Sequence, residues 1–600
     1  MSSDHSRRQP YSGFQRKLVI AFDVGTTFSG ASYAILEPGQ IPHIQGVTQF
    51  PGQQRVGGDS KIPSVVYYDE NGRVVAAGAE ADPETNYDLA DAEGLTRAEW
   101  FKLHLRPPHL AAEQGFDVRT LPPLPRNKSA NEIFGDLLKY LYESTRRYIQ
   151  ERQGASLWES VENSIEYVLS HPNGWEGQQQ NQMRKAAVFA GLVSNDSEAM
   201  QRISFVTEGE ASLCFCLNTI PSASNSHNGK GVMVVDCGGG TIDISTYTRN
   251  GSKFKEIAPP ECLLQGSIFV TNRAHAFLRE KLSHSQFGSE AELEVMKRYF
   301  DKTTKPTFKN ASKPCFVKFG RPTDSDPTCG VRSGSVKLSG TEIASFFDPA
   351  VTNILRVIGD QRRRSTVQIT TIFLVGGFAT SDYLFSQLSE HLKAWSIDLL
   401  RPDAYLNKAV AEGAVSYHID HFVSSRMAKY SYGIECCPLY NPSNPEHRSR
   451  QHRTFVVPSG ERWVNGGFST ILAKSVEVSE EKEFRRHYRN VFAENEFNSL
   501  VIKSSVVKCY RGNLETAPEW LDKAPGFFPD LCKITANVSE VKRTISPQFN
   551  RSGQKYYNLD FDVVLLFGLT ELKAQIAWND NGVEKRGPAS IVYDVNPTVN

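Results

Sequence analysis

The stretch "VMVVDCGGGTIDISTY", residues 232–247, constrains the fold of this chain more than any other segment. An apolar run ends in Asp236, three glycines follow, and Thr241 and Asp243 appear before the chain turns apolar again. This order predicts a β-hairpin whose tight turn carries almost no side chain. Because glycine has no Cβ, such a turn lets backbone N–H groups approach a phosphate closely.

A second stretch, "KLVIAFDVGTTFSGASYAIL" at 17–36, has the same layout: a strand ending at Asp23, then Gly25, Thr26 and Thr27, then another strand. One such hairpin alone would favour a plain flexible turn. Two matched hairpins, each with an aspartate just before the glycine, favour phosphate binding. A hairpin pattern that occurs twice, far apart in the sequence, also predicts two similar lobes that face each other.

The side chains around both turns suit a phosphate chain bound with a metal ion. Thr26, Thr27 and Thr241 add hydroxyl donors. Asp23, Asp236 and Asp243 would repel phosphate by themselves, and they make sense around Mg²⁺ and its water shell. The motifs of a P-loop, GxxxxGK[ST], and of a Rossmann turn, GxGxxG after a first strand, are absent.

Composition narrows the class of protein. The chain has 600 residues, which is too long for one core and predicts two or more domains. Lys+Arg and Asp+Glu both number 67, so no net charge favours nucleic acid or an anionic membrane as a partner. The 10 cysteines are scattered without zinc spacing, and no apolar run has membrane-spanning length. We expect a cytoplasmic or nuclear protein with free thiols.

Strand and helix signals alternate up to about residue 425, as in an α/β domain, and short strands separated by turn residues follow. The expected organisation is a disordered tail at 1–17, an α/β domain at 18–423, a connector at 424–430 and a β-rich domain at 431–600.

Two further motifs have weaker signals on their own. In "FLVGGFATSDYL", Gly376 and Gly377 form a glycine turn after a strand, which could lie flat against an adenine ring. In "EVMKRYF", Glu294, Lys297 and Arg298 lie on one face of a predicted helix. Alone, this charged face would be interpreted as solvated surface.

With these motifs the chain resembles the actin-like ATPases, and within them the 70-kDa heat-shock chaperones. It is most similar to their atypical branch, the 70-kDa heat shock protein 12 type common in fungi. The resemblance is carried by "DVGTTFSG", "DCGGGTID", "FLVGGF" and overall length. It implies a two-lobed nucleotide-binding domain whose hairpins clasp ATP or ADP with Mg²⁺, and a β-sandwich-like C-terminal domain.

The resemblance also assigns roles to residues. The first phosphate motif falls on Asp23, Gly25, Thr26 and Thr27, the second on Asp236, Gly238, Gly239, Gly240, Thr241 and Asp243, and the adenosine motif on Gly376 and Gly377. The Glu294, Lys297 and Arg298 helix would line the purine and ribose. Glu208 in "FVTEGEAS" would face the metal-bound water, Lys102 in "AEWFKLHL" the γ-phosphate, and Asp23 and Asp236 would hold Mg²⁺ through water.

The C-terminal half is the looser match. "YSYGIECCPLY" at 430–440 resembles the start of the chaperone peptide-binding domain, which implies unfolded or extended polypeptide clients and co-chaperones as partners. The connector "SSRMAKYS" is polar where the chaperones have an apolar linker. The sequence also leads us to expect no helical lid and no acidic tail for docking co-chaperones.

Three functions stay open from the sequence. The first is a slowly ATP-hydrolysing, chaperone-like protein with a polypeptide client. The second is a small-molecule kinase, such as a sugar kinase, on the same fold. The third is a nucleotide-gated scaffold that does not hydrolyse ATP. The helix with Glu294, Lys297 and Arg298 and the β-rich C-terminal half favour the first over the second.

Overall fold

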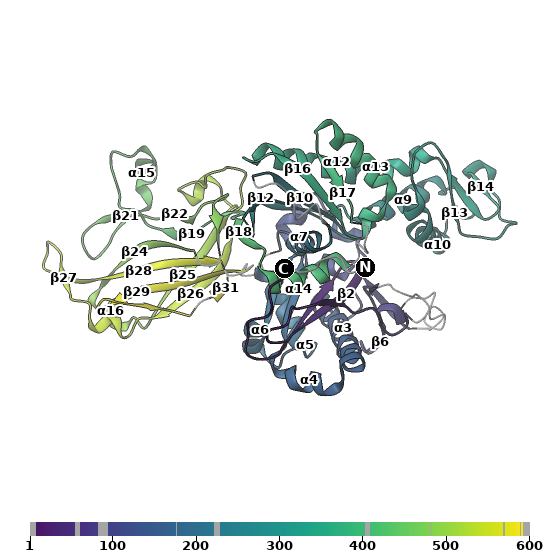
Figure 1. Ribbon diagram of the computed structural model, residues 1–600. Helices are drawn as coiled ribbons and strands as arrows, with labels where there is room; N and C mark the ends of the chain where they lie inside the picture. The colour runs from purple at the N-terminus through teal and green to yellow at the C-terminus, as the bar shows by residue number, and fades with distance from the viewer. Residues whose placement is uncertain are drawn as a thin grey trace. The chain divides into compact units, whose positions relative to one another are not determined.

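The computed structural model describes residues 8–53, 60–81, 94–175, 177–220, 229–251, 253–402, 408–479, 482–567, 571–588 and 590–591. The chain divides into two compact units, and many of their helices and strands are labelled in Figure 1. The first unit comprises Met1–Trp175 and Gln182–Val423, and the second comprises Glu176–Asn181 and Ser424–Asn600. The mixed α/β class expected from the sequence is confirmed.

The first sheet of the first unit is built on the first glycine hairpin. Its strand order is β3-β2-β1-β8-β9, with β4 also paired to β2. The hairpin strands β1 and β2 are antiparallel, and β8 and β9 follow β1 in parallel. The bounds are β1 (Lys17–Val24), β2 (Phe28–Leu36), β3 (Ile44–Gly46), β4 (Lys61–Pro63), β8 (Glu166–His171) and β9 (Ile203–Thr207).

The second sheet repeats this pattern on the second glycine hairpin. Its strands follow the order β17-β16-β10-β11-β12, with β10 and β11 antiparallel and with β16 and β17 parallel to β10. The bounds are β10 (Gly231–Cys237), β11 (Ile242–Asn250), β12 (Lys253–Leu263), β16 (Ile369–Val375) and β17 (Asp398–Leu400). The first unit therefore contains two lobes with one topology, as the paired hairpins predicted.

Long helices pack on these sheets. Both α3 (Ala130–Gln153) and α12 (Gly340–Arg364) begin with a serine capping box, which satisfies the first backbone N–H groups of each helix. Two buried helices, α7 (Glu208–Thr219) and α14 (Ala409–Asp420), cross so closely that a Cβ at Gly413 would overlap the carbonyl of Ala211. The other helices that matter here are α5 (Gly177–Phe189), α9 (Ser267–Lys281), α10 (Glu290–Tyr299) and α13 (Asp382–Ala394).

Two small sheets complete the first unit. One has the order β6-β5-β7, and the other has the order β13-β15-β14. Their bounds are β5 (Val65–Tyr68), β6 (Val74–Ala77), β7 (Thr96–Glu99), β13 (Cys315–Lys318), β14 (Val331–Arg332) and β15 (Ser335–Leu338). The short helix η2 (Phe101–Leu105) follows β7 and carries Lys102.

The N-terminal segment differs from the expected disordered tail. Arg8 forms an ion pair with Asp420 at 2.7 Å, and the backbone N–H of Tyr11 donates to the carbonyl of Gln40 at 2.9 Å. These contacts hold the segment from residue 8 onward against the first unit. Residues 1–7 lie outside the described residues.

The second unit consists mainly of two antiparallel sheets, with orders β22-β19-β25-β26 and β24-β28-β29-β30. One apolar core is shared by both, because Ile434 and Val507 of the first sheet and Val563 of the second belong to the same buried cluster. The bounds are β19 (Ser431–Cys436), β22 (Gly467–Leu472), β24 (Glu483–Ala493), β25 (Ile502–Tyr510), β26 (Asp530–Asn537), β28 (Lys555–Phe567), β29 (Leu572–Asp580) and β30 (Val583–Arg586).

The expected connector at 424–430 overlaps a strand. Residues Val423–Met427 form β18, and Arg426 pairs with Val478 of β23 (Glu477–Val478). Two short α-helices, α15 (Pro445–Ser449) and α16 (Glu494–Ser499), are described after this point.

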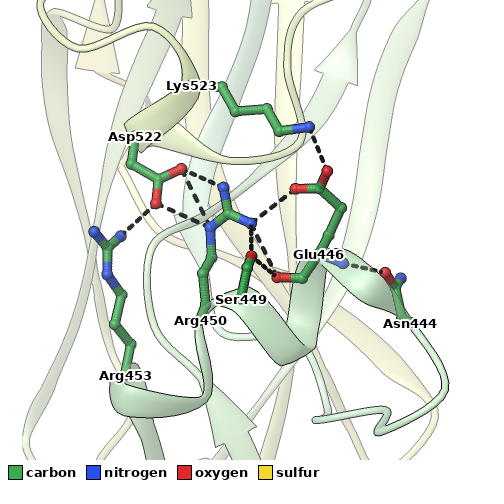
Figure 2. A network of polar contacts seen from close by, with 7 residues as sticks. All are labelled: Asn444, Glu446, Ser449, Arg450, Arg453, Asp522 and Lys523. Atoms are coloured by element: carbon green, nitrogen blue, oxygen red, sulfur yellow. Dashed lines mark hydrogen bonds and ion pairs between the residues drawn. The ribbon is translucent and has the colours of Figure 1, made fainter.

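A network of ion pairs holds the segment that contains α15 in place, as Figure 2 shows. Arg450, only 7% exposed, donates to Asp522 at 2.6 Å and to Glu446 at 2.8 Å, and it stacks over the ring of Trp520 at 4.4 Å. Lys523 reaches Glu446 at 2.8 Å. A planar guanidinium suits this site because it binds a carboxylate through two N–H groups while stacking on an aromatic face.

Candidate functional site

A cavity lies where the turns of the β1–β2 and β10–β11 hairpins meet. Thirteen of the predicted site residues line it: Asp23, Gly25, Thr26, Thr27, Lys102, Glu208, Asp236, Gly238, Gly239, Gly240, Thr241, Gly376 and Gly377. Phe28, Lys61 and Val410 line it as well, and the sequence had not singled them out. Residues more than 350 positions apart in the chain thus share one cavity.

The glycines are needed because the two turns touch. A Cβ at Gly239 would overlap the side chain of Thr27, and a Cβ at Gly240 would overlap that of Thr26. Gly376 has a left-handed φ of 88°, and a Cβ there would overlap the carboxylate of Asp236. Side chains at positions 239 and 240 would push the two turns apart, and a side chain at position 376 would displace Asp236 within the second lobe.

The peptide groups of the second turn all face the same way. The carbonyls of Gly238, Gly239 and Gly240 accept hydrogen bonds of 3.1, 3.0 and 3.2 Å from the backbone N–H groups of residues 266–268, where α9 begins. In a trans peptide the N–H of the next residue points opposite to the carbonyl. The N–H groups of residues 239–241 therefore point away from α9 as a group, which makes an anion-binding concavity.

The first turn also leaves donors available. The carbonyl of Thr27 accepts a 2.8 Å hydrogen bond from the backbone of Ser64. Within the described part of the chain, the backbone N–H groups of Thr26, Thr27, Gly239 and Gly240 have no hydrogen-bond partner. Both turns thus hold unused donors, and a phosphate chain supplies the acceptors that they lack.

Asp23 is held by groups from two other segments. Its Oδ2 lies 2.6 Å from Lys61 Nζ, and its Oδ1 accepts from Ser170 Oγ at 2.9 Å. Burial would by itself raise the pKa of Asp23, but the charges of Lys61 and Lys102 and the two hydrogen bonds lower it below its usual value. Asp23 is therefore a carboxylate at neutral pH.

Lys102 and Glu208 form a second buried pair in the cavity. Lys102 Nζ donates to Glu208 Oε1 at 2.6 Å, and it lies 5.6 Å from the ring centroid of Trp175. Glu208 is the first residue of α7, and Thr207 caps that helix by accepting from the backbone of Glu210. The cap fixes the point at which Glu208 enters the cavity.

Asp236 and Asp243 face each other across the second hairpin. Asp236 accepts from Ser212 Oγ at 2.6 Å, and Asp243 Oδ1 accepts from the backbone N–H of Asn173 at 2.6 Å. Burial, together with the charge of Glu208, raises the pKa of Asp236 to about 7. Burial and the charges of Glu208 and Asp236 raise the pKa of Asp243 well above its usual value. An opposite charge beside this pair would favour the charged forms of both carboxyls.

The residues of the cavity fit a hydrated divalent cation. Three carboxylates, at positions 23, 208 and 236, line the cavity with two lysines, at 61 and 102. Asp243 is not among the lining residues, but it lies opposite Asp236 on the paired strand, and its Oδ2 is buried without a hydrogen bond. Among the described residues, no group of three or more acidic, histidine or cysteine side chains converges to hold a metal directly. Mg²⁺ suits this arrangement because it keeps several waters when it binds protein.

The predicted purine helix lies apart from the cavity lining. Glu294, Lys297 and Arg298 are on α10, where Lys297 reaches Glu294 at 3.3 Å and Arg298 Nε donates to the carbonyl of Glu294 at 3.3 Å. Lys297 also lies 5.2 Å from the ring centroid of Trp100, two residues before Lys102. None of these three charged residues is among those that line the cavity, so their role toward purine and ribose stays a prediction.

Four residues that contact the site could not be predicted from the sequence, because each reaches it through a contact between segments that are far apart in the chain. Lys61 reaches Asp23 through the pairing of β4 with β2, and Ser170 does so from the parallel neighbour β8. Asn173 and Ser212 reach Asp243 and Asp236 from outside both hairpins. The local sequence of these residues has no feature that signals the contact.

Comparison with known proteins agrees with this architecture. The chain is 21% identical to Heat shock 70 kDa protein 12B of Homo sapiens over 78% of each chain. It is also 21% identical to Heat shock 70 kDa protein 12A of Homo sapiens and of Mus musculus, over 78% of this chain and 79% of each relative. The predicted resemblance to the 12-type heat-shock proteins is confirmed.

These similarities support an actin-fold architecture of the 70-kDa heat-shock type, and they do not favour a sugar kinase. No protein-family model matches the chain. Within the part of the chain that the structure describes, no helix has the length and apolar character needed to cross a membrane.

The raised pKa of Asp236 predicts a pH-dependent cost to stability. The folded protein keeps a proton on Asp236 up to a pKa of about 7, whereas the unfolded chain loses it near 3.8. Stability should therefore fall as pH rises through this window, and Asp236→Asn should remove the part of the loss that comes from Asp236. We expect the free energy of unfolding of the variant, relative to wild type, to rise steadily as pH increases between about pH 5 and pH 7.

Chemical denaturation of both proteins in EDTA, without nucleotide, measures this difference. Asp398→Asn on β17, where the carboxylate is exposed, is the matched control and should show no such trend. A difference between wild type and Asp236→Asn that does not change with pH would contradict the predicted electrostatics of the cavity.

Proposed function

We propose that this protein binds ATP with Mg²⁺ between the two lobes, hydrolyses it slowly to ADP and phosphate, and holds extended polypeptide in its second unit. The observation that carries the nucleotide site is the presence of unused backbone N–H groups from both glycine turns at one cavity. The similarity to the 12-type heat-shock proteins supports the same conclusion.

We assign each group of residues at the cavity a separate role in phosphoryl transfer. The N–H groups of the two turns and the hydroxyls of Thr26, Thr27 and Thr241 hold the phosphate chain. Lys102, positioned by Glu208, faces the terminal phosphate, and Asp243 orients the attacking water. Asp236 and Asp243, with Asp23, would hold Mg²⁺ through its water shell, and the ion would offset charge that develops on the phosphates.

Asp243 tests the proposed chemistry. Asp243→Asn keeps the size of the side chain and the acceptor for the Asn173 N–H but removes the charge that orients water. On the scale for one preorganised electrostatic group, turnover should fall by roughly 10²-fold or more while ATP still binds. Single-turnover hydrolysis of labelled ATP, with calorimetry for affinity, measures both effects.

Asp398→Asn is again the matched control, because its exposed carboxylate lies outside the cavity. Turnover by Asp243→Asn at the wild-type rate would show that the assigned role is wrong. Phosphate appearing on an added sugar instead of in solution would point to a kinase.

For the second unit we propose a β-sandwich-like domain, without a helical lid, that binds an extended segment as an added strand. The added strand could pair with one edge of strand β28. On the side away from β24 it pairs with β27 (Gln548–Phe549) at residues 555–556 and with β29 from Asp562 to Phe567. Between these pairings, residues 557–561 have no partner strand on that edge among the described residues. Such an edge presents backbone donors and acceptors to another chain.

A cavity of about 490 Å³ opens at this gap. Its lining includes five consecutive residues of β28, 558–562, so it faces the edge of the strand and not one face of the sheet. Val541 and Ile545 add an apolar wall. Trp578, only 8% exposed, also lines the cavity and has a buried Nε1–H without a hydrogen bond. A peptide carbonyl would satisfy this donor.

The second unit should bind an unfolded apolar peptide, and ATP should weaken that binding. Coupling free energies are typically ~1–3 kcal/mol, which corresponds to a change of roughly 5- to 150-fold in peptide Kd. We expect the lower end of this range because a domain without a lid releases peptide quickly in either state. Fluorescence anisotropy of a labelled peptide, with ADP and with ATP, measures the change.

Ile545→Asp should weaken peptide binding by placing a charge in the apolar wall of the cavity. The control is Leu514→Asp, which makes the same change at a residue that is 58% exposed and outside the cavity lining. Equal peptide affinities with ADP and ATP would leave a binder without coupling. Absence of peptide binding in both states would favour a nucleotide-gated scaffold.

A further inference from the structure

Lys61 occupies a position that the two hairpins alone do not explain. It begins β4, which pairs with β2 so that Lys61 lies opposite Gly30, and Gly30 in turn lies opposite Asp23 of β1. The three residues form one row across three strands. Because Gly30 has no side chain, Lys61 passes over it, and a Cβ at Gly30 would lie 3.2 Å from Lys61 Cγ.

The pair formed by Lys61 and Asp23 is buried and lines the phosphate cavity. Lys61 Nζ lies 2.6 Å from Asp23 Oδ2, and the two side chains are 15% and 4% exposed. The other oxygen of Asp23 accepts from Ser170 at 2.9 Å. Both oxygens of this carboxylate are therefore engaged, and its charge is matched by an ammonium group within the cavity.

The second hairpin differs from the first in how the charges of its carboxylates are compensated. Asp236 and Asp243 lie opposite each other on paired strands, and neither forms an ion pair among the described residues. Lys102, the other cation of the cavity, is paired with Glu208. The uncompensated negative charge thus lies on the second hairpin, whereas the first hairpin carries its own counter-charge.

We propose that Lys61 is a further nucleotide-binding residue, whose ammonium contacts the phosphate chain and supplies at the first hairpin the positive charge that a cation near Asp23 would otherwise provide. This inference rests on the proposed nucleotide site. An unpaired carboxylate at this position would repel phosphate, and either a metal ion or a lysine offsets that repulsion. With Lys61 in place, ATP binding depends on Mg²⁺ mainly through Asp236 and Asp243.

The test compares ATP affinity of the full chain in Mg²⁺ and in EDTA by calorimetry. Removal of Lys61 in Lys61→Met leaves Asp23 unpaired, so the ratio of Kd in EDTA to Kd in Mg²⁺ should rise at least roughly tenfold over the wild-type ratio, the scale of one charge-assisted contact. The control is Lys17→Met on β1, which breaks an ion pair with Glu166 outside the cavity and should leave the ratio unchanged.

A second comparison avoids a buried unpaired carboxylate, in case Lys61→Met does not fold. Asp23→Asn alone keeps Lys61 and should bind ATP in EDTA at least as tightly as wild type. The double variant Asp23→Asn/Lys61→Met should bind at least roughly tenfold more weakly than Asp23→Asn under the same conditions.

The outcomes separate this inference from the nucleotide site. Equal ratios for wild type and Lys61→Met, or equal EDTA affinities for Asp23→Asn and the double variant, would overturn the role of Lys61 while ATP binding stands. Absence of ATP binding by wild type in both conditions would overturn the nucleotide site itself, and the role of Lys61 with it.

Discussion

The contact between the two glycine turns is the constraint on which the site depends. Gly239 and Gly240 of one lobe lie so close to Thr27 and Thr26 of the other that no side chain fits between them. This approach brings backbone donors from both turns to one cavity. It also places carboxylates from both hairpins within reach of a single phosphate chain and its counter-ion.

Besides this close contact, the balance of charge in the cavity determines the properties of the site. The cavity gathers more carboxylates than lysines, and the pKa values of Asp236 and Asp243 are raised first by burial and then by the neighbouring negative charges. A site of this kind is destabilising to the protein alone and gains stability when a cation binds. Lys61, which forms an ion pair with Asp23, and Lys102, which forms one with Glu208, offset part of the charge. The charges of the site are therefore balanced only when a cation or a ligand that carries one is bound.

Much of this could be predicted from the sequence because the decisive features are local. A strand that ends in aspartate, glycines and threonine is visible in "VMVVDCGGGTIDISTY", and its match at 17–36 predicted the duplicated lobes. Lys61 could not be predicted, because its approach to Asp23 depends on the register of β4 against β2. The helix with Lys297 was predicted as a helix, but its place outside the cavity lining depends on how α10 packs.

The most direct test of the account is hydrogen–deuterium exchange of the full chain with and without Mg²⁺ and ATP. If backbone N–H groups of both turns hold the phosphates, ATP should slow exchange at Thr26 and Thr27 and at residues 239–241 together, although these segments are more than 200 positions apart. Unchanged exchange at both turns under conditions where ATP binds, or protection of one turn alone, would contradict the claim.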